Sequence, residues 1–234
     1  MLGGVHGTKD EVLTNLAAIR TAIREAAESV GRDPAEVALV AAAKTVPVEP
    51  VRWVVEAGVS AIGENYVHEL RTMRPALADP AVRWHFIGTL QSSTAHHVAD
   101  LADVVETVAG ERAARRLAGR ASRAGRPVDV LLEVDLTGVR SGASPEELPG
   151  LAALVAGLEG VRLRGLMTLP PIPEVAEDAR PWFQLLRDLR DRLRENHPEV
   201  LDLSMGMSLD YRVAVEEGAT MVRIGTALFG PRTS

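Results

Sequence analysis

The chain has 234 residues, of which 46% are apolar, and a formal net charge of −6. This length fits one large domain or two small ones, with enough apolar residues for a substantial core. The absence of cysteine excludes disulfides, thiolate zinc sites and thiol nucleophiles, and it fits a reducing compartment. The sequence shows neither a signal peptide nor the ~18 consecutive apolar residues that cross a bilayer. We therefore expect a cytoplasmic protein that does not bind membranes.

The first predicted element is a helix that begins after Thr8. Thr8 and Glu11 have the spacing of a capping box, and Gly31 is placed to end the helix. Apolar residues recur at helical spacing between them, at Val12, Leu16, Ile19, Ile23 and Val30.

An alternation of apolar runs and helical segments follows this helix. The strand-like runs are 37–44, 61–64, 83–88, 103–108, 128–136, 161–169, 201–205 and 221–228. The helical segments include 48–57, 66–78, 110–124, 146–157, 176–195 and 209–217. The alternation predicts an α/β fold, a (β/α)8 TIM-type barrel with an extra N-terminal helix, and an open doubly wound sheet is the competitor. No linker divides the chain, so we expect a single domain over residues 1–234.

The arginines of segment 110–124 need an explanation, because clustered positive charge can bind nucleic acids. They are interleaved with acidic residues and small residues, at Arg112, Arg115, Arg116, Arg120 and Arg123. A solvated helix face is the favoured interpretation, and a nucleic-acid-binding stripe is the alternative. We therefore expect no nucleic-acid partner.

Polar residues gather where the predicted strands end, which is where such barrels hold their ligands. Lys44 ends the first strand, Asn65 follows the second, and His85 lies in the third. Lysine forms Schiff bases with aldehydes, but a lysine at a strand end can also simply extend into water. On this residue alone, both interpretations stay open.

The last two strand ends have the composition of a phosphate site. Segments 205–208 and 223–226 each supply a glycine and a hydroxyl, and the loops after strands seven and eight commonly bind phosphate in this fold. Ordinary turns would use the same residues. Arg223 lies within an apolar strand, so it either pairs with a strand carboxylate such as Glu64 or faces a ligand ring.

Six segments closely resemble the pyridoxal phosphate homeostasis protein family, whose members are single-domain relatives of the alanine racemase N-terminal barrel. The resemblance runs in order from about residue 8 to 230, through Ala43-Lys44-Thr45-Val46-Pro47, Ile62-Gly63-Glu64-Asn65-Tyr66, Trp84-His85-Phe86-Ile87-Gly88, Gly165-Leu166-Met167-Thr168, Leu203-Ser204-Met205-Gly206-Met207-Ser208 with Asp210-Tyr211, and Val222-Arg223-Ile224-Gly225-Thr226-Ala227-Leu228-Phe229-Gly230.

The resemblance implies a barrel that holds pyridoxal 5′-phosphate (PLP), a form of vitamin B6. Lys44 matches the lysine that forms the Schiff base, and Arg223 matches the arginine that faces the pyridine nitrogen. An arginine there keeps this nitrogen unprotonated, which suits a carrier or a racemase better than an aminotransferase. The other matching positions are the phosphate cradle and the pocket lining: Ser208, Gly225 and Thr226 with Ser204 close by, and Asn65 and His85.

The sequence departs from the family pattern after the third strand. The family usually has Leu-Gln-x-Asn-Lys there, whereas this chain has Ser92-Ser93-Thr94 after Leu90-Gln91. The contribution of this loop to ligand contacts or to cofactor transfer is therefore in doubt. His96 and His97 follow it as expected surface residues of a helix, and we assign no metal site.

Two functions remain, a carrier and an enzyme. As a carrier, the protein binds PLP, buffers it and delivers it to apo-enzymes that depend on it. As an amino-acid racemase it would need a second base on the other face of the α-carbon, which in alanine racemases is a tyrosine from a second domain. The chain ends soon after the eighth strand, at Ser234, so we expect a carrier without catalytic residues, and a monomer. A barrel that binds another phosphorylated ligand is a third option, against which the Lys44 motif argues.

Overall fold

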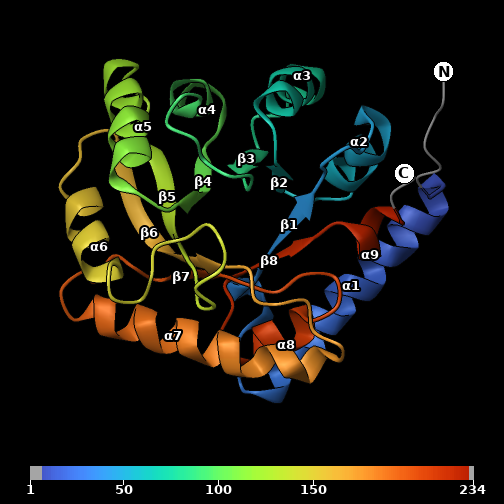
Figure 1. Cartoon of the computed structure of the whole chain (residues 1–234). Helices are drawn as coiled ribbons and strands as arrows, with labels where there is room; N and C mark the ends of the chain where they lie inside the picture. Colours follow the sequence, from blue (N-terminus) through green and yellow to red (C-terminus); the bar gives the residue numbers. More distant parts are fainter. Residues whose placement is uncertain (1–6, 232–234) are drawn as a thin grey trace.

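The computed structural model describes residues 7–231. Eight parallel strands form a closed barrel in chain order, with β8 hydrogen-bonded to β1 (Figure 1). The predicted (β/α)8 barrel with an extra N-terminal helix is confirmed, and the open sheet is excluded. The strands are β1 (Ala38–Ala42), β2 (Ala61–Glu64), β3 (Arg83–Phe86), β4 (Val104–Val108), β5 (Val128–Val134), β6 (Val161–Thr168), β7 (Asp202–Ser204) and β8 (Met221–Ile224).

Helices lie between the strands and surround the barrel (Figure 1). They are α1 (Lys9–Ser29), α2 (Val48–Glu56), α3 (Val67–Leu77), α4 (Ala95–Leu101), α5 (Glu111–Arg123), α6 (Leu148–Ala156), α7 (Arg180–Arg194), α8 (Tyr211–Glu216) and α9 (Thr226–Phe229), with short 3-10 turns at Pro34–Glu36 and Ala176–Ala179. The extra helix, α1, packs against α2, α8 and α9. None of the described helices is long and apolar enough to cross a membrane.

The predicted start of α1 is confirmed by its hydrogen bonds. The Thr8 hydroxyl accepts from the Glu11 N–H, and the Glu11 carboxylate accepts from the Thr8 N–H at 2.7 Å. Gly31 follows the end of the helix with a φ of +72°, which glycine adopts without a steric penalty.

The barrel separates two apolar regions. Alternate strand residues point inward and form a small cluster inside the barrel, which includes Val40, Ala61, Val104, Leu131, Met167 and Met221. The other strand residues point outward and pack under the helices in one large core. Ile62 and Val222 belong to this outer core, one residue away from Ala61 and Met221 of the inner cluster.

The predicted eighth strand is too long. Segment 221–228 was expected to be extended throughout, but β8 ends at Ile224 and α9 begins at Thr226. Apolar runs of this length do not distinguish a strand from a short helix. Gly225 lies at the change of direction, and the N–H groups of Phe229 and Leu228 both donate to its carbonyl. The turn therefore exposes the first N–H groups of α9 beside the strand ends.

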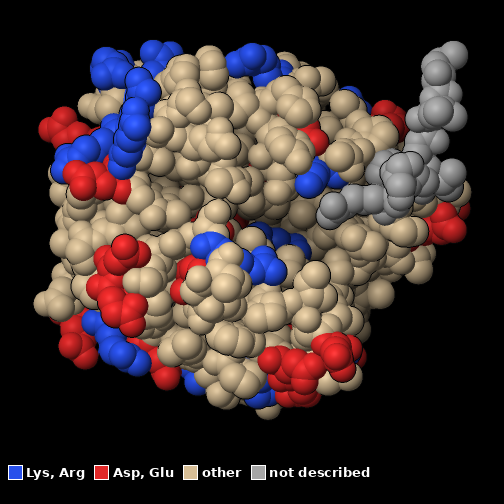
Figure 2. All heavy atoms as spheres, viewed as in Figure 1, with Lys and Arg blue, Asp and Glu red and all other residues tan. Residues whose placement is uncertain are grey.

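Positive side chains cover the surface of α5 (Figure 2). Two of its arginines pair with acids, since Arg115 lies 2.7 Å from Glu111 and Arg120 lies 2.7 Å from Asp100. These pairs fit the interpretation of α5 as a solvated helix face.

Candidate cofactor-binding site

Lys44 lies two residues beyond β1, in a turn at the C-terminal end of the barrel. Its amine lies over the ring of Tyr66, 5.2 Å from the ring centre. No carboxylate of residues 7–231 pairs with it within 4 Å. Lys44 therefore has no ion-pair partner in the described part of the chain, and its amine is available to a ligand.

A cavity of about 330 Å³ opens at this end of the barrel, within the roughly 300–1,000 Å³ of small-ligand pockets. Six of the eight predicted site residues line it: Lys44, Asn65, Ser208, Arg223, Gly225 and Thr226. Apolar residues complete the wall, including Ile87, Leu169, Ile172 and Leu209. The strand ends thus bring together groups that are far apart in the sequence, as expected for this fold.

Asn65 reaches the cavity because two strands approach each other closely behind it. A Cβ added to Gly88, after β3, would lie 2.0 Å from the Asn65 carbonyl oxygen. Only glycine permits this approach, so Gly88 fixes the position of the Asn65 backbone.

Ser208 follows β7 and α9 follows β8, so both are separated from Asn65, which follows β2, by β1 in the strand order of the barrel. The Ser208 hydroxyl accepts from the Ala227 N–H at 3.1 Å, which ties the loop after β7 to α9. The N–H groups at the start of a helix have no acceptor within the helix. Thr226 therefore offers both a hydroxyl and a backbone donor to an anion in the cavity.

Arg223 lies at the floor of the cavity and is only 4% exposed. One of its terminal nitrogens donates to the Ser204 hydroxyl at 2.5 Å, and the other donates to the Thr168 carbonyl at 2.9 Å. The carboxylate that faces it is Glu106 of β4, at 3.8 Å. Arg223 therefore pairs with a strand carboxylate, as one of the two alternatives expected, but this carboxylate is Glu106, and the choice of Glu64 as its example is wrong.

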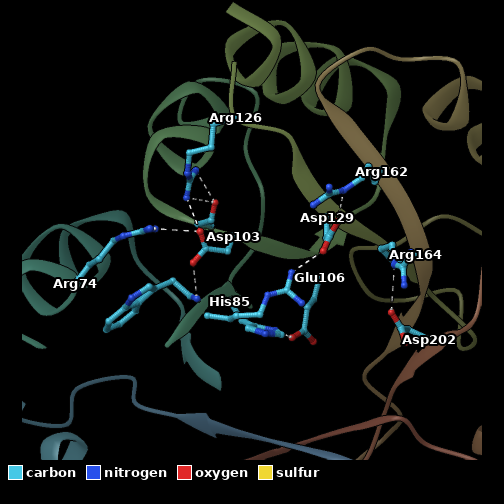
Figure 3. A network of polar contacts seen from close by, with 12 residues as sticks. Arg74, His85, Asp103, Glu106, Arg126, Asp129, Arg162, Arg164 and Asp202 are labelled. Carbon is cyan, nitrogen blue, oxygen red and sulfur yellow. Dashed lines mark hydrogen bonds and ion pairs between the residues drawn. The ribbon is translucent and has the colours of Figure 1, made fainter. Parts of the chain in front are cut away.

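His85 and Ser204 lie below the cavity rather than in its wall. The His85 ring nitrogen Nδ1 lies 2.6 Å from one Glu106 oxygen (Figure 3). The Ser204 hydroxyl donates to the other Glu106 oxygen at 2.5 Å. Ser204 therefore contacts Arg223 directly, and His85 is linked to Arg223 through Glu106. His85 lines a different cavity, at the N-terminal end of the barrel.

Burial and neighbouring charges shift the pKa values of the acids and of Arg223 in opposite directions. Burial raises the pKa of the Glu106 carboxyl, but the hydrogen bond from His85 and the charges of His85 and Arg223 hold that pKa below its usual range. Burial lowers the pKa of Arg223 against the opposing charge of Glu106. Burial also raises the pKa of Glu133, on β5, to about 7, although Arg223 opposes this.

Two further residues belong to the site and were not selected from the sequence. Glu106 is an acid in the middle of an apolar strand, which is itself a signal because a buried charge needs a partner. Asp210 lines the cavity and accepts from the Met207 N–H at 2.6 Å, so it shapes the loop that carries Ser208.

The set of donors fits PLP. An aldehyde requires an amine, a phosphate requires hydroxyls and backbone N–H groups, and a pyridine nitrogen can face a cation. Lys44, the Ser208–Thr226 side and Arg223 supply these three in one cavity. In residues 7–231 no group of three or more metal-ligating side chains is present, and His96 and His97 lie on α4 with their rings 3.9 Å apart.

Comparison with known proteins agrees with this barrel. The model of the alanine racemase N-terminal domain matches residues 14–233, so the fold and site define a member of that class of barrel. The chain is 42% identical over 223 residues to the pyridoxal phosphate homeostasis protein of Pseudomonas aeruginosa, covering 94% of this chain and 96% of that protein. It is 40% identical over 220 residues to the one from Aquifex aeolicus, covering 93% and 96%. The chain belongs to the pyridoxal phosphate homeostasis protein family, as its motifs predicted.

Solved structures give the same result. PipY of Synechococcus elongatus, solved with PLP bound, superposes with a TM-score of 0.83 at 32% identity, covering 94% of this chain and 100% of that one. An alanine racemase of Clostridium difficile superposes with a TM-score of 0.76 at 18% identity, covering 96% of this chain and 58% of that one. The second likeness concerns the fold alone.

Proposed function

We propose that this protein binds PLP at the C-terminal end of the barrel, buffers the intracellular supply and delivers PLP to apo-enzymes that require it. The observation that carries the proposal is the single cavity shared by the unpaired amine of Lys44, the guanidinium of Arg223 and the Ser208–Thr226 donors. The names of the relatives and the PLP bound in PipY support it.

Each residue has a separate task in this proposal. PLP, when bound, supplies an aldehyde for a lysine amine and a ring that can withdraw electrons. Lys44 supplies the amine. Ser208, Gly225 and Thr226 hold the phosphate, and Asn65 lines the side of the pocket. Arg223 presents a fixed positive charge to the ring nitrogen and keeps a proton away from it.

Glu106, His85 and Ser204 hold Arg223 in place. A long arginine side chain would otherwise lose several rotatable bonds of freedom on meeting a ring. Here, hydrogen bonds to Ser204 and Thr168 and the charge of Glu106 fix it beforehand. A guanidinium that is fixed in this way suits tight binding of the ligand ring. It does not suit proton transfer, because a catalytic acid or base must release and take up a proton.

A carrier is favoured over an amino-acid racemase. A racemase needs a proton donor on each face of the α-carbon. The chain has two tyrosines, and Tyr66 lies against the Lys44 amine itself, so it does not oppose that amine across the cavity. Exchange of the α-proton of L- and D-alanine in D2O, followed by NMR, tests this choice: no exchange supports the carrier, and exchange that depends on Lys44 supports the racemase. The cytoplasmic location and the monomeric state stay predictions.

The first experiment is borohydride reduction of the protein mixed with PLP, followed by peptide mass mapping. The chain has only two lysines, Lys9 and Lys44, which makes the result unusually clear. A phosphopyridoxyl adduct on Lys44 is expected, and the Lys9→Arg variant should give the same adduct. Modification of Lys9 alone, or none, would contradict the proposal and favour a barrel that binds another phosphorylated ligand.

A further inference from the structure

Glu64 is a buried acid that the proposed cofactor site does not use. It is the last residue of β2, and its side chain points away from the barrel interior, because Ala61 of the same strand belongs to the inner cluster and strand side chains alternate. Glu64 is 0% exposed. Neither of its carboxyl oxygens receives a hydrogen bond from any donor of residues 7–231. Buried polar atoms without a partner are rare and need an explanation.

The explanation lies on α3, where a second carboxyl group faces the first. The Glu69 side chain is close enough for its charge and a hydrogen bond to raise the pKa of Glu64. Its Oε2 is also buried without a donor among the described residues, whereas its Oε1 accepts from the Thr45 N–H at 3.0 Å. Two carboxylates cannot bond each other, because both are acceptors only, but a protonated carboxyl group can donate to a carboxylate.

Thr45 connects this pair to the cofactor site. It follows Lys44 directly and has a φ of +62°, a backbone conformation that a β-branched residue avoids. Strain of this kind persists only where neighbouring groups fix it. The bond from the Thr45 N–H to Glu69 is one such contact, and it lies next to the residue whose side chain must enter the cavity.

We propose that Glu64 is a carboxylic acid that donates its proton to the Glu69 carboxylate, and that this pair fixes the Thr45 turn and so orients Lys44 toward the cavity. The shared proton between Glu64 and Glu69 does not depend on any ligand, whereas the orientation of Lys44 toward the cavity rests on the proposed function. Glu64 and Glu69 are thus positioning residues, since they act on Lys44 through the backbone.

The electrostatics around Glu64 agree with a neutral acid. Burial raises its pKa to about 9, and the charge and hydrogen bond of Glu69 act in the same direction. No cation of residues 7–231 forms an ion pair with Glu64. The amine of Lys44, which follows β1, lies over the Tyr66 ring. The residue of β3 in register with Glu64 is the uncharged Phe86.

Several other charged groups on these elements have contacts of their own, and Arg71 of α3 is exposed to solvent. His85 of β3 pairs with Glu106, Glu49 and Arg52 of α2 pair with each other at 3.8 Å, and His68 of α3 stacks on Tyr66. On α3, Arg74 binds Asp103 at the other end of the barrel.

Infrared spectroscopy of the full chain without PLP tests the shared proton. The spectrum at pH 8 should contain the C=O stretch of a protonated carboxylic acid, and the Glu64→Gln variant should lack it. Glu133, with a pKa of about 7, is mostly ionised at this pH and interferes little. An unchanged band in Glu64→Gln, or no such band in the parent protein, would overturn the proposal.

The pH dependence of stability gives a second, independent measurement. Glu64 ionises near its usual value of 4.5 when the chain unfolds and near 9 when it is folded. The contribution of Glu64 to stability should therefore be greatest below pH 4.5 and should fall as the pH rises to about 9, because the folded state retains a proton that the unfolded state has released. Glu64→Gln should flatten this fall, since glutamine can donate to Glu69 without ionising. Parallel profiles for the two proteins would contradict the proposal.

The link to Lys44 is tested by removing the Glu69 carboxylate and then restoring its acceptor. In the Lys9→Arg chain, where Lys44 is the last lysine, Glu69→Ala should speed amide hydrogen exchange at Thr45 and raise the Kd for PLP roughly fivefold, which corresponds to one hydrogen bond. Glu69→Gln should restore both values, because its amide oxygen can accept from Thr45. Unchanged exchange and Kd in Glu69→Ala would refute the positioning role.

A matched control separates this effect from general damage. Glu147 also accepts a backbone N–H, from Ser144 at 3.0 Å, but it does not line the cavity. Glu147→Ala should leave the Kd for PLP unchanged, and a fivefold rise in this variant too would count against a specific role of Glu69. Mapping of the borohydride adduct in Glu69→Ala keeps the two proposals apart. An adduct still on Lys44 supports the proposed function whatever the Kd shows.

Discussion

The two ends of the barrel use charged residues in opposite ways. At the N-terminal end they are paired with one another (Figure 3), and the pairs are Arg74 and Arg126 with Asp103, Arg83 and Arg162 with Asp129, and Arg164 with Asp202. At the C-terminal end, the Lys44 amine has no acid partner in the described chain.

The size of a cavity is a poor guide to which end binds the ligand. A hollow of about 820 Å³ lies at the N-terminal end, more than twice the 330 Å³ of the cavity at the C-terminal end. Four of the five arginines in its wall, all except Arg71, are already bound to Asp103, Asp129 and nearby carbonyls. The smaller cavity holds the Lys44 amine, which has no acid partner within residues 7–231. We infer that the N-terminal end contributes stability and the C-terminal end contributes the site, which is the usual division in this fold.

The largest effect on PLP binding is expected from Lys44→Ala, at the C-terminal end of the barrel. This variant should fold normally and keep weak PLP binding through the phosphate donors, but it should lose all visible absorption that comes from covalent attachment. Lys9→Arg is the control, because it removes the other lysine far from the cavity. Unchanged visible absorption of Lys44→Ala with PLP would remove Lys44 from this role.

Glu106→Gln should come next, because it affects both stability and the site. It removes the one described carboxylate within 4 Å of the buried guanidinium of Arg223, and breaking a buried pair of this kind costs about 3–5 kcal/mol. Urea denaturation measures the cost, and PLP titration should show weaker binding in the fraction that folds. A stability within about 1 kcal/mol of the parent protein would mean that Ser204 and Thr168 suffice to hold Arg223.

Glu133→Gln should change the pH dependence of stability. Burial raises the pKa of Glu133 from 4.5 to about 7 in the folded protein. The contribution of Glu133 to stability should therefore fall between pH 4.5 and 7, by up to roughly 1.4 kcal/mol per pH unit, and stay level above 7. The variant should lack this component and be more stable than the parent at neutral pH. Denaturation curves at pH 5 and pH 7.5 measure it, and an equal difference at both values would disprove the assignment.

The smallest effect is expected from Asp129→Asn at the N-terminal end. The change weakens two ion pairs, but both arginines are more than half exposed, so water screens them. We expect a loss of about 1 kcal/mol in unfolding free energy and no change in PLP affinity. A marked loss of PLP affinity would break the division between the two ends.

Several parts of the site could be predicted because their signals are local. Lys44 stands out at the end of an apolar run, and Ser208, Gly225 and Thr226 combine small and hydroxyl residues at strand ends. Lys44 and these three residues line one cavity in the structure. The roles assigned to them stay predictions until the adduct is mapped.

Other parts could not be predicted, because they depend on which strands become neighbours or face each other across the barrel. The sequence offered several acids as the partner of Arg223, and Glu64 was the one named. Only closure of the barrel places Glu106 of β4 opposite Arg223 of β8. The same closure places His85 beneath the cavity, against Glu106. The extent of β8 was also misjudged, because a short apolar run fits both a strand and a helical turn.

The sequence by itself determined the order of elements, the (β/α)8 barrel and the family, since apolar periodicity and turn residues act over a few positions along the chain. The tertiary structure decided which polar groups meet: Arg223 with Glu106, and Glu69 with the Thr45 N–H beside Lys44. The physical reason is that a buried polar group takes its partner from whatever packing brings within about 3 Å, and residues that are far apart in the sequence supply that partner.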